Sequence, residues 1–564
     1  MKRSLVLFLL PALAAAATPP QSVTLTASEK SAANAITEDV IRGHVRFLGS
    51  DLLEGRAPAS RGDVLAQQYI QAQMEGLGLE PGAPGGGWIQ KVPLVGITGK
   101  IPEKITVERA GRTIDFKTMD DYVAFSGTQK AESKIDKAEI VFVGYGIVAP
   151  EFQWDDYKDV DVKGKILLMM NNDPEDDPNL FAGKTRLWYG RWDYKYMIAA
   201  RKGAVGAFII HTQPSAGYPW QVVRTSWSGE HFELPYAGEP RVEIKGWFTE
   251  DASKKIASLG GQDLDRLRQA AQKRDFRPVP LGVDISMRIE NSVQSKDSAN
   301  VVGKLPGSDP KLATEAVVYT AHHDHLGMKM DAKPGEDAIY NGALDNASGV
   351  GAMLAIAKAF KQLPKAPRRS IYFASVTAEE QGLLGSEYLA KHPPVAAGRI
   401  ASNINIDGVS IFGRTRDITM IGYGKSSLDP IIVALAKTEG RVVKPDQFPD
   451  RGFFYRSDQF NLAKEGVPAA YFDSGTDVIG KPASWGKSKL EEWEARDYHQ
   501  PSDELKSEWD LSGAVEDVRL DFWLGVKVAN ADRMPEWKKG DEFEAARKKA
   551  LSEVSVGAAG IENR

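Results

Sequence analysis

Cysteine is absent from this 564-residue sequence. Its absence excludes disulfide bonds, a thiolate nucleophile and cysteine-ligated zinc, so a metal site would have to use His, Asp and Glu side chains. An excess of one charge sign is missing as well, because 71 Lys and Arg residues stand against 76 Asp and Glu residues. Proteins that bind nucleic acid usually carry a clear basic excess, so nucleic acid is not the expected partner.

The sequence has no apolar run long enough to cross a membrane, and its most apolar segment is a short run near the N-terminus. It covers residues 5–13 after Lys2 and Arg3, and three alanines at residues 15–17 precede Thr18. A membrane anchor would need about 20 apolar residues, so the pattern indicates a secretory signal peptide at residues 1–17. We therefore expect a periplasmic or secreted protein with no membrane association after cleavage.

The length predicts two or three domains, and changes in composition and in hydrophobic pattern along the chain suggest the domain boundaries. Residues 18–100 read as a helical part of the catalytic domain, residues 101–290 as a β-rich inserted domain, residues 291–533 as the catalytic domain and residues 534–564 as a charged tail. In residues 291–533 strands and helices alternate, which predicts an α/β fold with a mainly parallel mixed sheet and helices on both faces. The predicted strands are 316–321, 370–376, 402–406, 417–421 and 469–472, and the predicted helices are 349–363, 384–391, 428–439, 459–465 and 516–531.

Most clusters of His, Asp and Glu in the catalytic region fall just after a predicted strand, and active sites of such sheets lie at the carboxyl ends of the strands. Taken singly, the clusters have ordinary explanations, since an Asp before a helix is usually a cap and adjacent glutamates are usually solvated. Together they can converge at one edge of the sheet, and they are the ligand types that divalent cations prefer. The candidate residues are His322, Asp345, Glu379, Glu380, Asp407 and His499.

This set suits hydrolysis with two metal ions. Two metals about 3.5–4 Å apart can activate one water molecule and polarise one carbonyl group. One carboxylate must bridge the metals, and a separate carboxylate must take the proton from the water. The adjacent pair Glu379 and Glu380 can supply one metal ligand and one general base, because neighbouring side chains point in different directions.

Five motifs stand out, at residues 321–325, 342–349, 378–382, 405–408 and 498–503. In these motifs the sequence resembles the M28 family of metallopeptidases, which have the zinc aminopeptidase (phosphorylase/hydrolase-like) fold. The middle region resembles the protease-associated (PA) domain that many members insert, on the weaker evidence of residues 163–167 and 203–207, and Gly55-Arg56 resembles the family's N-terminal region.

The resemblance implies two Zn²⁺ ions per chain. It assigns His322 and Asp407 to the first metal, Glu380 and His499 to the second, and Asp345 to a bridging position. His323 and His325 are not ligands in the matched pattern. The resemblance also implies a non-proline cis peptide bond after Asp345.

The resemblance further assigns Glu379 as the general base and Tyr498 as a hydrogen-bond donor to the substrate carbonyl. Asp324 would orient His322, because metal-bound histidines commonly need such a partner. The loop at residues 328–341 is longer than in the smallest members of the family, so the resemblance does not determine the structure of the pocket rim.

The leading interpretation is an exported di-zinc aminopeptidase that cleaves N-terminal residues from peptides by attack of a metal-bridged hydroxide. A glutaminyl cyclase-like acyltransferase with one zinc is an alternative, as is a carboxypeptidase of the same fold in which Arg451 or Arg456 binds an acidic terminus. A binding protein without activity would be expected to lack a ligand, and every expected ligand is present. The sequence does not fix the oligomeric state.

Overall fold

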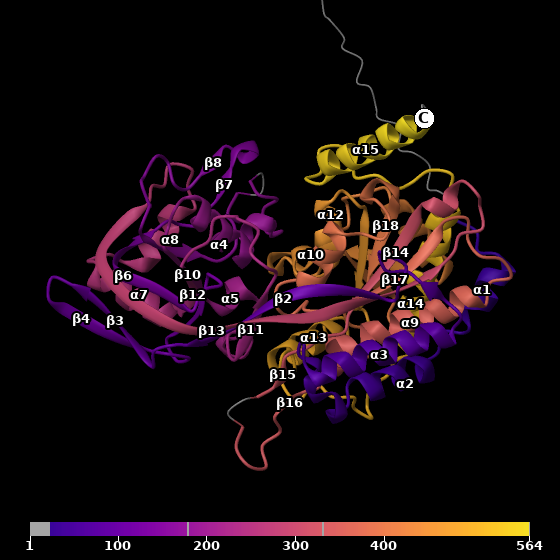
Figure 1. Ribbon diagram of the computed structural model, residues 1–564, viewed down its shortest axis with the longest axis horizontal. Helices are drawn as coiled ribbons and strands as arrows, with labels where there is room; N and C mark the ends of the chain where they lie inside the picture. The colour runs from indigo at the N-terminus through magenta and orange to yellow at the C-terminus, as the bar shows by residue number, and fades with distance from the viewer. Residues whose placement is uncertain (1–22, 178–179, 330–331, 563–564) are drawn as a thin grey trace, which may run out of the picture.

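The computed structural model describes residues 23–177, 180–329 and 332–562. The predicted signal peptide, residues 1–17, lies outside them. Figure 1 shows two lobes. The larger lobe is built from the described residues within 23–88 and 301–562, and the smaller lobe from those within 101–289. Among the described helices, none combines the length and the apolar character that crossing a membrane requires.

The larger lobe is organised around a mixed sheet whose central strands are parallel. β17 pairs in parallel with β14, β14 with β18, and β18 with β21, whereas β19 is antiparallel to β21. This agrees with the predicted α/β fold class. The strands are β14 (Ala316–His322), β17 (Ser370–Val376), β18 (Ile400–Asn405), β19 (Asp417–Ile421), β20 (Val442–Pro445) and β21 (Ala469–Asp473).

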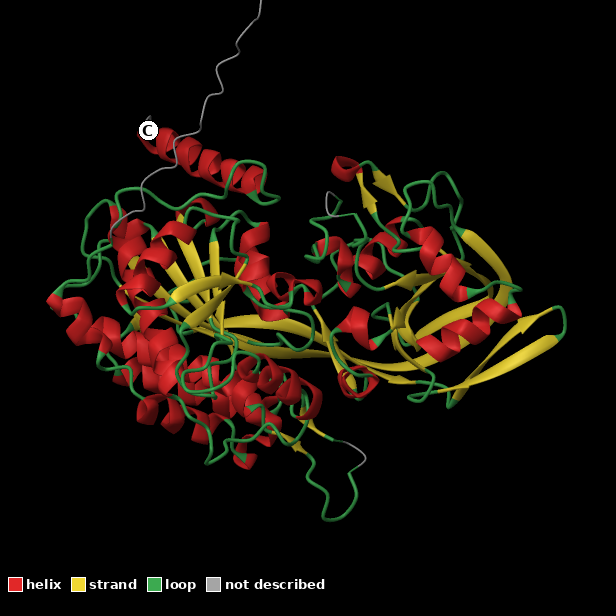
Figure 2. Cartoon of the chain, turned by 180° about the vertical axis from the view of Figure 1, so that it is seen from behind, coloured by secondary structure: helices red, strands yellow, loops and turns green. Residues whose placement is uncertain are grey.

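Helices cover both faces of this sheet (Figure 2). Every residue of β14 is buried, and its side chains alternate between two hydrophobic clusters. Val317 and Tyr319 pack in the main core, and Val318 packs in a separate cluster on the opposite face. A strand buried on both faces needs such a continuous apolar run. The helices of this lobe are α1 (Ala27–Ala33), α2 (Glu38–Leu48), α3 (Arg61–Gly76), α9 (Gly349–Lys361), α10 (Leu384–Lys391), α11 (Asp429–Thr438), α12 (Gln459–Lys464), α13 (Trp485–Arg496), α14 (Ser512–Asn530) and α15 (Glu544–Glu562).

The smaller lobe has a hydrophobic core of its own, in which Phe142, Phe208 and Trp247 are buried. Its parallel strands β6, β9, β10 and β12 are continued by antiparallel β5. The main elements are β3 (Lys104–Arg109), β4 (Arg112–Lys117), β5 (Tyr122–Ser126), β6 (Glu132–Phe142), β9 (Ile166–Met170), β10 (Gly206–His211), β11 (Glu230–Glu233), β12 (Ile244–Thr249), α4 (Trp192–Arg201), α5 (Gln213–Ala216), α6 (Trp220–Ser226), α7 (Glu250–Leu259) and α8 (Leu264–Ala271).

Two long strands run from one lobe into the other. β13 (Val279–Leu305) pairs with β6 and β3 in the smaller lobe and with β17 in the larger lobe. Between these regions it pairs with β2 (Ile89–Lys100) over the whole length of that strand. The two sheets are therefore continuous through β13, a feature that the sequence did not predict.

Candidate metal centre

The carboxyl ends of neighbouring strands bring the predicted polar clusters together. His322 is the last residue of β14, Glu379 and Glu380 follow β17, and Asp407 follows β18. Asp345 lies in the irregular turn at residues 343–348 that leads into α9, and the peptide bond after it is cis, as the family resemblance implies. His499 comes from the loop that follows α13.

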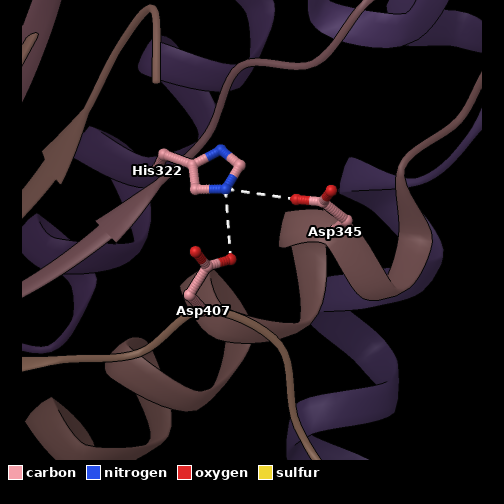
Figure 3. A group of neighbouring side chains, drawn as sticks. All are labelled: His322, Asp345 and Asp407. Atoms are coloured by element: carbon pink, nitrogen blue, oxygen red, sulfur yellow. Dashed lines mark hydrogen bonds and ion pairs between the residues drawn. The ribbon is translucent and has the colours of Figure 1, made fainter. Parts of the chain in front are cut away.

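His322 faces two carboxylates (Figure 3). Its Nε2 atom lies 3.2 Å from Oδ1 of Asp345 and 3.3 Å from Oδ1 of Asp407. Burial would lower the pKa of this histidine, but the surrounding carboxylates, that of Glu379 foremost, outweigh burial and hold the pKa well above its ordinary value. A positive charge at this point, whether a proton or a metal ion, is therefore strongly favoured.

His499 faces the other oxygen of Asp345. Its Nε2 atom lies 3.4 Å from Oδ2 of Asp345 and 3.0 Å from Oε2 of Glu380. These contacts are close, yet Nε2 makes no well-directed hydrogen bond with any residue that the structure describes. Burial would lower the pKa of His499, but the carboxylates of Glu380 and Asp345 raise it to about 10. A buried ring nitrogen without a hydrogen bond between two carboxylates fits a metal ligand.

Three groups of donor atoms in the described residues are close enough to hold a metal ion. The distance between donors within each group is at most 4.8 Å. They unite His322 with Asp345 and Asp407, His322 with Glu379 and Glu380, and His325 with Asp345 and Glu380. Four of the five predicted ligands belong to these groups, and His499 joins them through its contacts with Asp345 and Glu380. The assignment of each ligand to a particular metal stays a prediction.

The two histidines that the family resemblance does not assign as ligands have different surroundings. His323 is fully buried and bonded away from the cluster, with Nε2 3.1 Å from Oδ1 of Asp63 and Nδ1 3.0 Å from Oγ of Ser375. His325 lies beside the cluster, with Nδ1 2.5 Å from Oε1 of Glu380. Its exclusion as a ligand therefore stays a prediction.

Asp324 acts mainly on the glutamate pair. Its carboxylate accepts hydrogen bonds from the backbone N–H groups of Glu379 (3.0 Å) and Glu380 (3.3 Å). Nδ1 of His322 lies 3.3 Å from the backbone oxygen of Asp324 and 3.7 Å from its carboxylate. The closer partner of the histidine is thus a backbone carbonyl, which can fix its tautomer equally well.

Glu379 lies beside His322 in the cluster. Its Oε2 atom lies 4.0 Å from Nε2 of His322. Burial, with a further contribution from the neighbouring carboxylates, raises the pKa of Glu379 well above its ordinary value despite the opposing effect of His322. A raised carboxyl pKa next to a reaction centre is what a group that both takes and returns a proton needs.

Two residues that received no role from the sequence hold the turn around Asp345. Asp503 accepts hydrogen bonds from the backbone N–H groups of Leu344 (2.9 Å) and Asp345 (3.0 Å). Burial raises the pKa of Asp503 to about 6. Arg56 is also fully buried. It donates to the backbone oxygens of His323 (2.7 Å), Asn341 (2.6 Å), Gly342 (2.9 Å) and Leu48. Both residues lie inside motifs quoted above, but their roles depend on contacts that spacing does not reveal.

A cavity of about 150 Å³ opens beside the cluster. Asp345, Glu379 and Asp407 line one side of it. The remaining wall is largely apolar and includes Ile411, Phe412, Phe448, Phe453, Leu490 and Trp493. Tyr498 also lines the cavity, and its hydroxyl accepts a hydrogen bond from Nη2 of Arg456 at 3.2 Å.

Comparison with known families identifies the region that carries the cluster. Residues 300–523 match the family model described as "Peptidase family M28". The matched region contains β14, β17, β18 and every candidate ligand. The match does not reach residues 101–290, so their identification as a protease-associated domain stays a prediction.

Several aminopeptidases have sequences similar to parts of this chain. The chain is 25% identical over 291 residues to the Aminopeptidase NAALADL1 of Rattus norvegicus, which covers 43% of this chain and 36% of that protein. It is 30% identical over 137 residues to a probable leucine aminopeptidase 2 of Aspergillus oryzae, which covers 24% of this chain and 22% of that protein. The chain thus spans about a third or less of the length of these relatives.

The fold has a counterpart among solved structures. An aminopeptidase from Aneurinibacillus sp. strain AM-1 aligns with a TM-score of 0.52 and 18% identity, over 89% of this chain and 96% of that chain. At this identity the similarity shows the fold alone, and that fold includes both lobes over most of their length.

Proposed function

We propose that this protein is a di-zinc aminopeptidase that hydrolyses the first peptide bond of its substrates. One observation supports this most directly: the two carboxylate oxygens of Asp345 face two different histidines, His322 through Oδ1 and His499 through Oδ2. A carboxylate placed in this way can bridge two metal ions. The named relatives, which are aminopeptidases, support the direction of cleavage.

The charges of the cluster also suit two divalent ions. Asp345, Glu379, Glu380 and Asp407 would bring four negative charges when ionised, and two Zn²⁺ ions would balance them. Asp407 and His322 would hold one ion, Glu380 and His499 the other, and Asp345 both. Bound zinc supplies a Lewis acid for the scissile carbonyl and lowers the pKa of a water molecule.

The side chains of this protein would carry out the remaining steps. Glu379 accepts the proton of the attacking water on its carboxylate and later donates it to the leaving amine. Tyr498 donates its hydroxyl hydrogen to the oxygen that develops negative charge, and Arg456 supports the orientation of that hydroxyl. The apolar cavity takes the first side chain of the substrate, so we expect a preference for apolar N-terminal residues.

A carboxypeptidase is the second candidate, and one observation favours it. Arg451 forms an ion pair with Glu494, but Nη1 of Arg456 has no hydrogen-bond partner among residues 23–177, 180–329 and 332–562. Arg456 lines the cavity, and this buried nitrogen could bind a C-terminal carboxylate if the side chain turned toward it. The same apparatus would then act at the opposite end of a peptide.

The test is metal content by mass spectrometry combined with hydrolysis of leucyl-nitroanilide and of N-blocked dipeptides, before and after chelation. About two zinc ions per chain and chelator-sensitive release from leucyl-nitroanilide support the aminopeptidase. Release only from N-blocked dipeptides would indicate the carboxypeptidase, and one zinc ion with cyclisation of a glutaminyl peptide would indicate the acyltransferase.

The general base is tested with Glu379→Gln. We expect turnover to fall by about 10²–10⁴-fold with zinc content unchanged, whereas Asp345→Ala should lose zinc. A Glu379→Gln enzyme that keeps its activity would refute the assigned role. We also propose export, with the mature chain starting at Thr18, which N-terminal sequencing of the native protein would establish.

A further inference from the structure

The smaller lobe contacts one of the candidate metal ligands. Ser226 is the last residue of α6, in the smaller lobe. Its Oγ atom lies 3.2 Å from Nδ1 of His499, which is 273 positions away in the sequence. The other ring nitrogen of His499 faces Asp345 and Glu380. One imidazole thus joins the metal cluster on one side to the smaller lobe on the other.

This contact can decide the tautomer of the histidine. Nε2 of His499 can bind a metal ion only when it carries no proton, so the proton of the neutral ring must be on Nδ1. A protonated Nδ1 needs an acceptor, and the hydroxyl oxygen of Ser226 lies at hydrogen-bond distance from it. His322 has no such dependence on the smaller lobe, because the backbone oxygen of Asp324 lies next to its own Nδ1.

The position of His499 in the chain makes an outside partner more important. His322 ends β14, where the backbone is fixed by the sheet. His499 lies in a loop and has a left-handed backbone conformation, with φ of 57°. Its ring packs on Tyr498, with a centroid distance of 3.9 Å. Stacking fixes the plane of a ring, but a hydrogen bond is needed to fix its rotation and tautomer.

Other contacts hold the smaller lobe against the same site. The backbone N–H of Phe232, in β11, donates to Oε1 of Gln381 at 3.0 Å, directly after the glutamate pair. The guanidinium of Arg456 lies 5.4 Å from the ring centre of Tyr218. These contacts place α6 next to His499, and they lie along an interlobe cleft that is lined from both sides.

We propose that Ser226 is a positioning residue through which the smaller lobe holds His499 in the orientation and tautomer required for metal binding. The smaller lobe would then complete one of the two metal positions. The inference rests on the proposed di-zinc function, because it concerns the ion held by Glu380 and His499 and leaves the ion held by His322 and Asp407 unaffected.

The experiment measures the two zinc affinities separately, by competition with a chelator, in wild-type protein and in Ser226→Ala. We expect one affinity to weaken by about 10–100-fold and the other to stay within about twofold. Ser226→Thr keeps a hydroxyl and should restore most of the loss. Ser228→Ala is the matched control, since Ser228 is exposed and donates to the backbone oxygen of Thr225 in its own segment.

A purely structural role would give a different result. It would lower the thermal midpoint of the zinc-free protein and weaken both zinc affinities together, and this outcome would overturn the inference. Two unchanged affinities in Ser226→Ala would overturn it as well, while the di-zinc function would stand. Wild-type protein that binds fewer than two zinc ions would overturn the proposed function and this inference together.

Discussion

Replacing Asp503 with asparagine should make the turn that carries Asp345 less stable, although Asp503 is not itself a predicted metal ligand. Asp503 is 1% exposed, and its two carboxylate oxygens each accept one backbone N–H, from Leu344 and from Asp345. An asparagine of the same shape can satisfy one of these groups through its carbonyl. Its NH₂ group would face the other N–H as a second donor, so one buried donor would lose its partner.

The size of the effect follows from these contacts. A buried donor without a partner costs about 1–3 kcal/mol, and a hydrogen bond to a charged group contributes about 1.5–3 kcal/mol. Because the two figures describe overlapping effects, we expect Asp503→Asn to lower the free energy of unfolding of the larger lobe by about 2–4 kcal/mol. Since the turn also orients Asp345, the zinc dissociation constant should rise by about 10–100-fold.

Urea unfolding of the zinc-free protein measures the first quantity, and chelator competition at pH 7.5 measures the second. Ser502→Ala is the control, because Ser502 is the exposed neighbour. If Asp503→Asn unfolded within about 0.5 kcal/mol of wild type and bound zinc within twofold, the turn would not depend on Asp503 and the reasoning would fail.

Three further changes test other parts of the structure. Arg56→Met leaves four backbone oxygens without their buried donor, and it should lower the free energy of unfolding by at least about 3 kcal/mol in urea titrations; a change below about 1 kcal/mol would contradict this. Burial, with repulsion from Lys358, lowers the pKa of His44 from 6.5 to about 4. The unfolded chain therefore binds a proton first as the pH falls, and stability is lost between pH 6.5 and 4, by up to about 3 kcal/mol. His44→Gln should remove that pH dependence in urea titrations at pH 7 and 4.5, whereas His392→Gln, at an exposed site, should retain it. Tyr498→Phe should lower kcat by about 10²–10³-fold with unchanged KM and zinc content in steady-state assays; an unchanged kcat would remove Tyr498 from the mechanism.

The catalytic half of the fold was predictable because its strands are buried on both faces. The runs at 316–321, 370–376 and 417–421 are apolar enough to be recognised locally, and the structure confirms all three as strands. The polar residues directly after such strands then had to meet at one edge of the sheet. That rule brought His322, Glu380 and Asp407 together without any knowledge of distances.

Other features had no local signal. The middle of β13 is half-exposed and includes Lys296 and Asp297, so it has the polar composition of a linker. α13 was missed for a similar reason, since it is a charged helix in which only Gly486 is buried. The contact between Ser226 and His499 and the carbonyl oxygens around Arg56 depend on tertiary packing across long stretches of sequence, and no spacing rule predicts them.

The long strand β13 connects the two lobes rigidly, because it is part of the sheet in each of them. The backbone hydrogen bonds of β13 continue from β6 through β2 to β17. Bending one lobe away from the other would therefore strain these hydrogen bonds, because among the described residues no flexible hinge replaces them between the lobes. Force applied to the smaller lobe would be transmitted to β17, whose end precedes the glutamate pair. Cleft opening should therefore occur by twisting about β2 and β13, which keeps their pairing intact, and large closing motions of the kind seen in hinged enzymes are not expected.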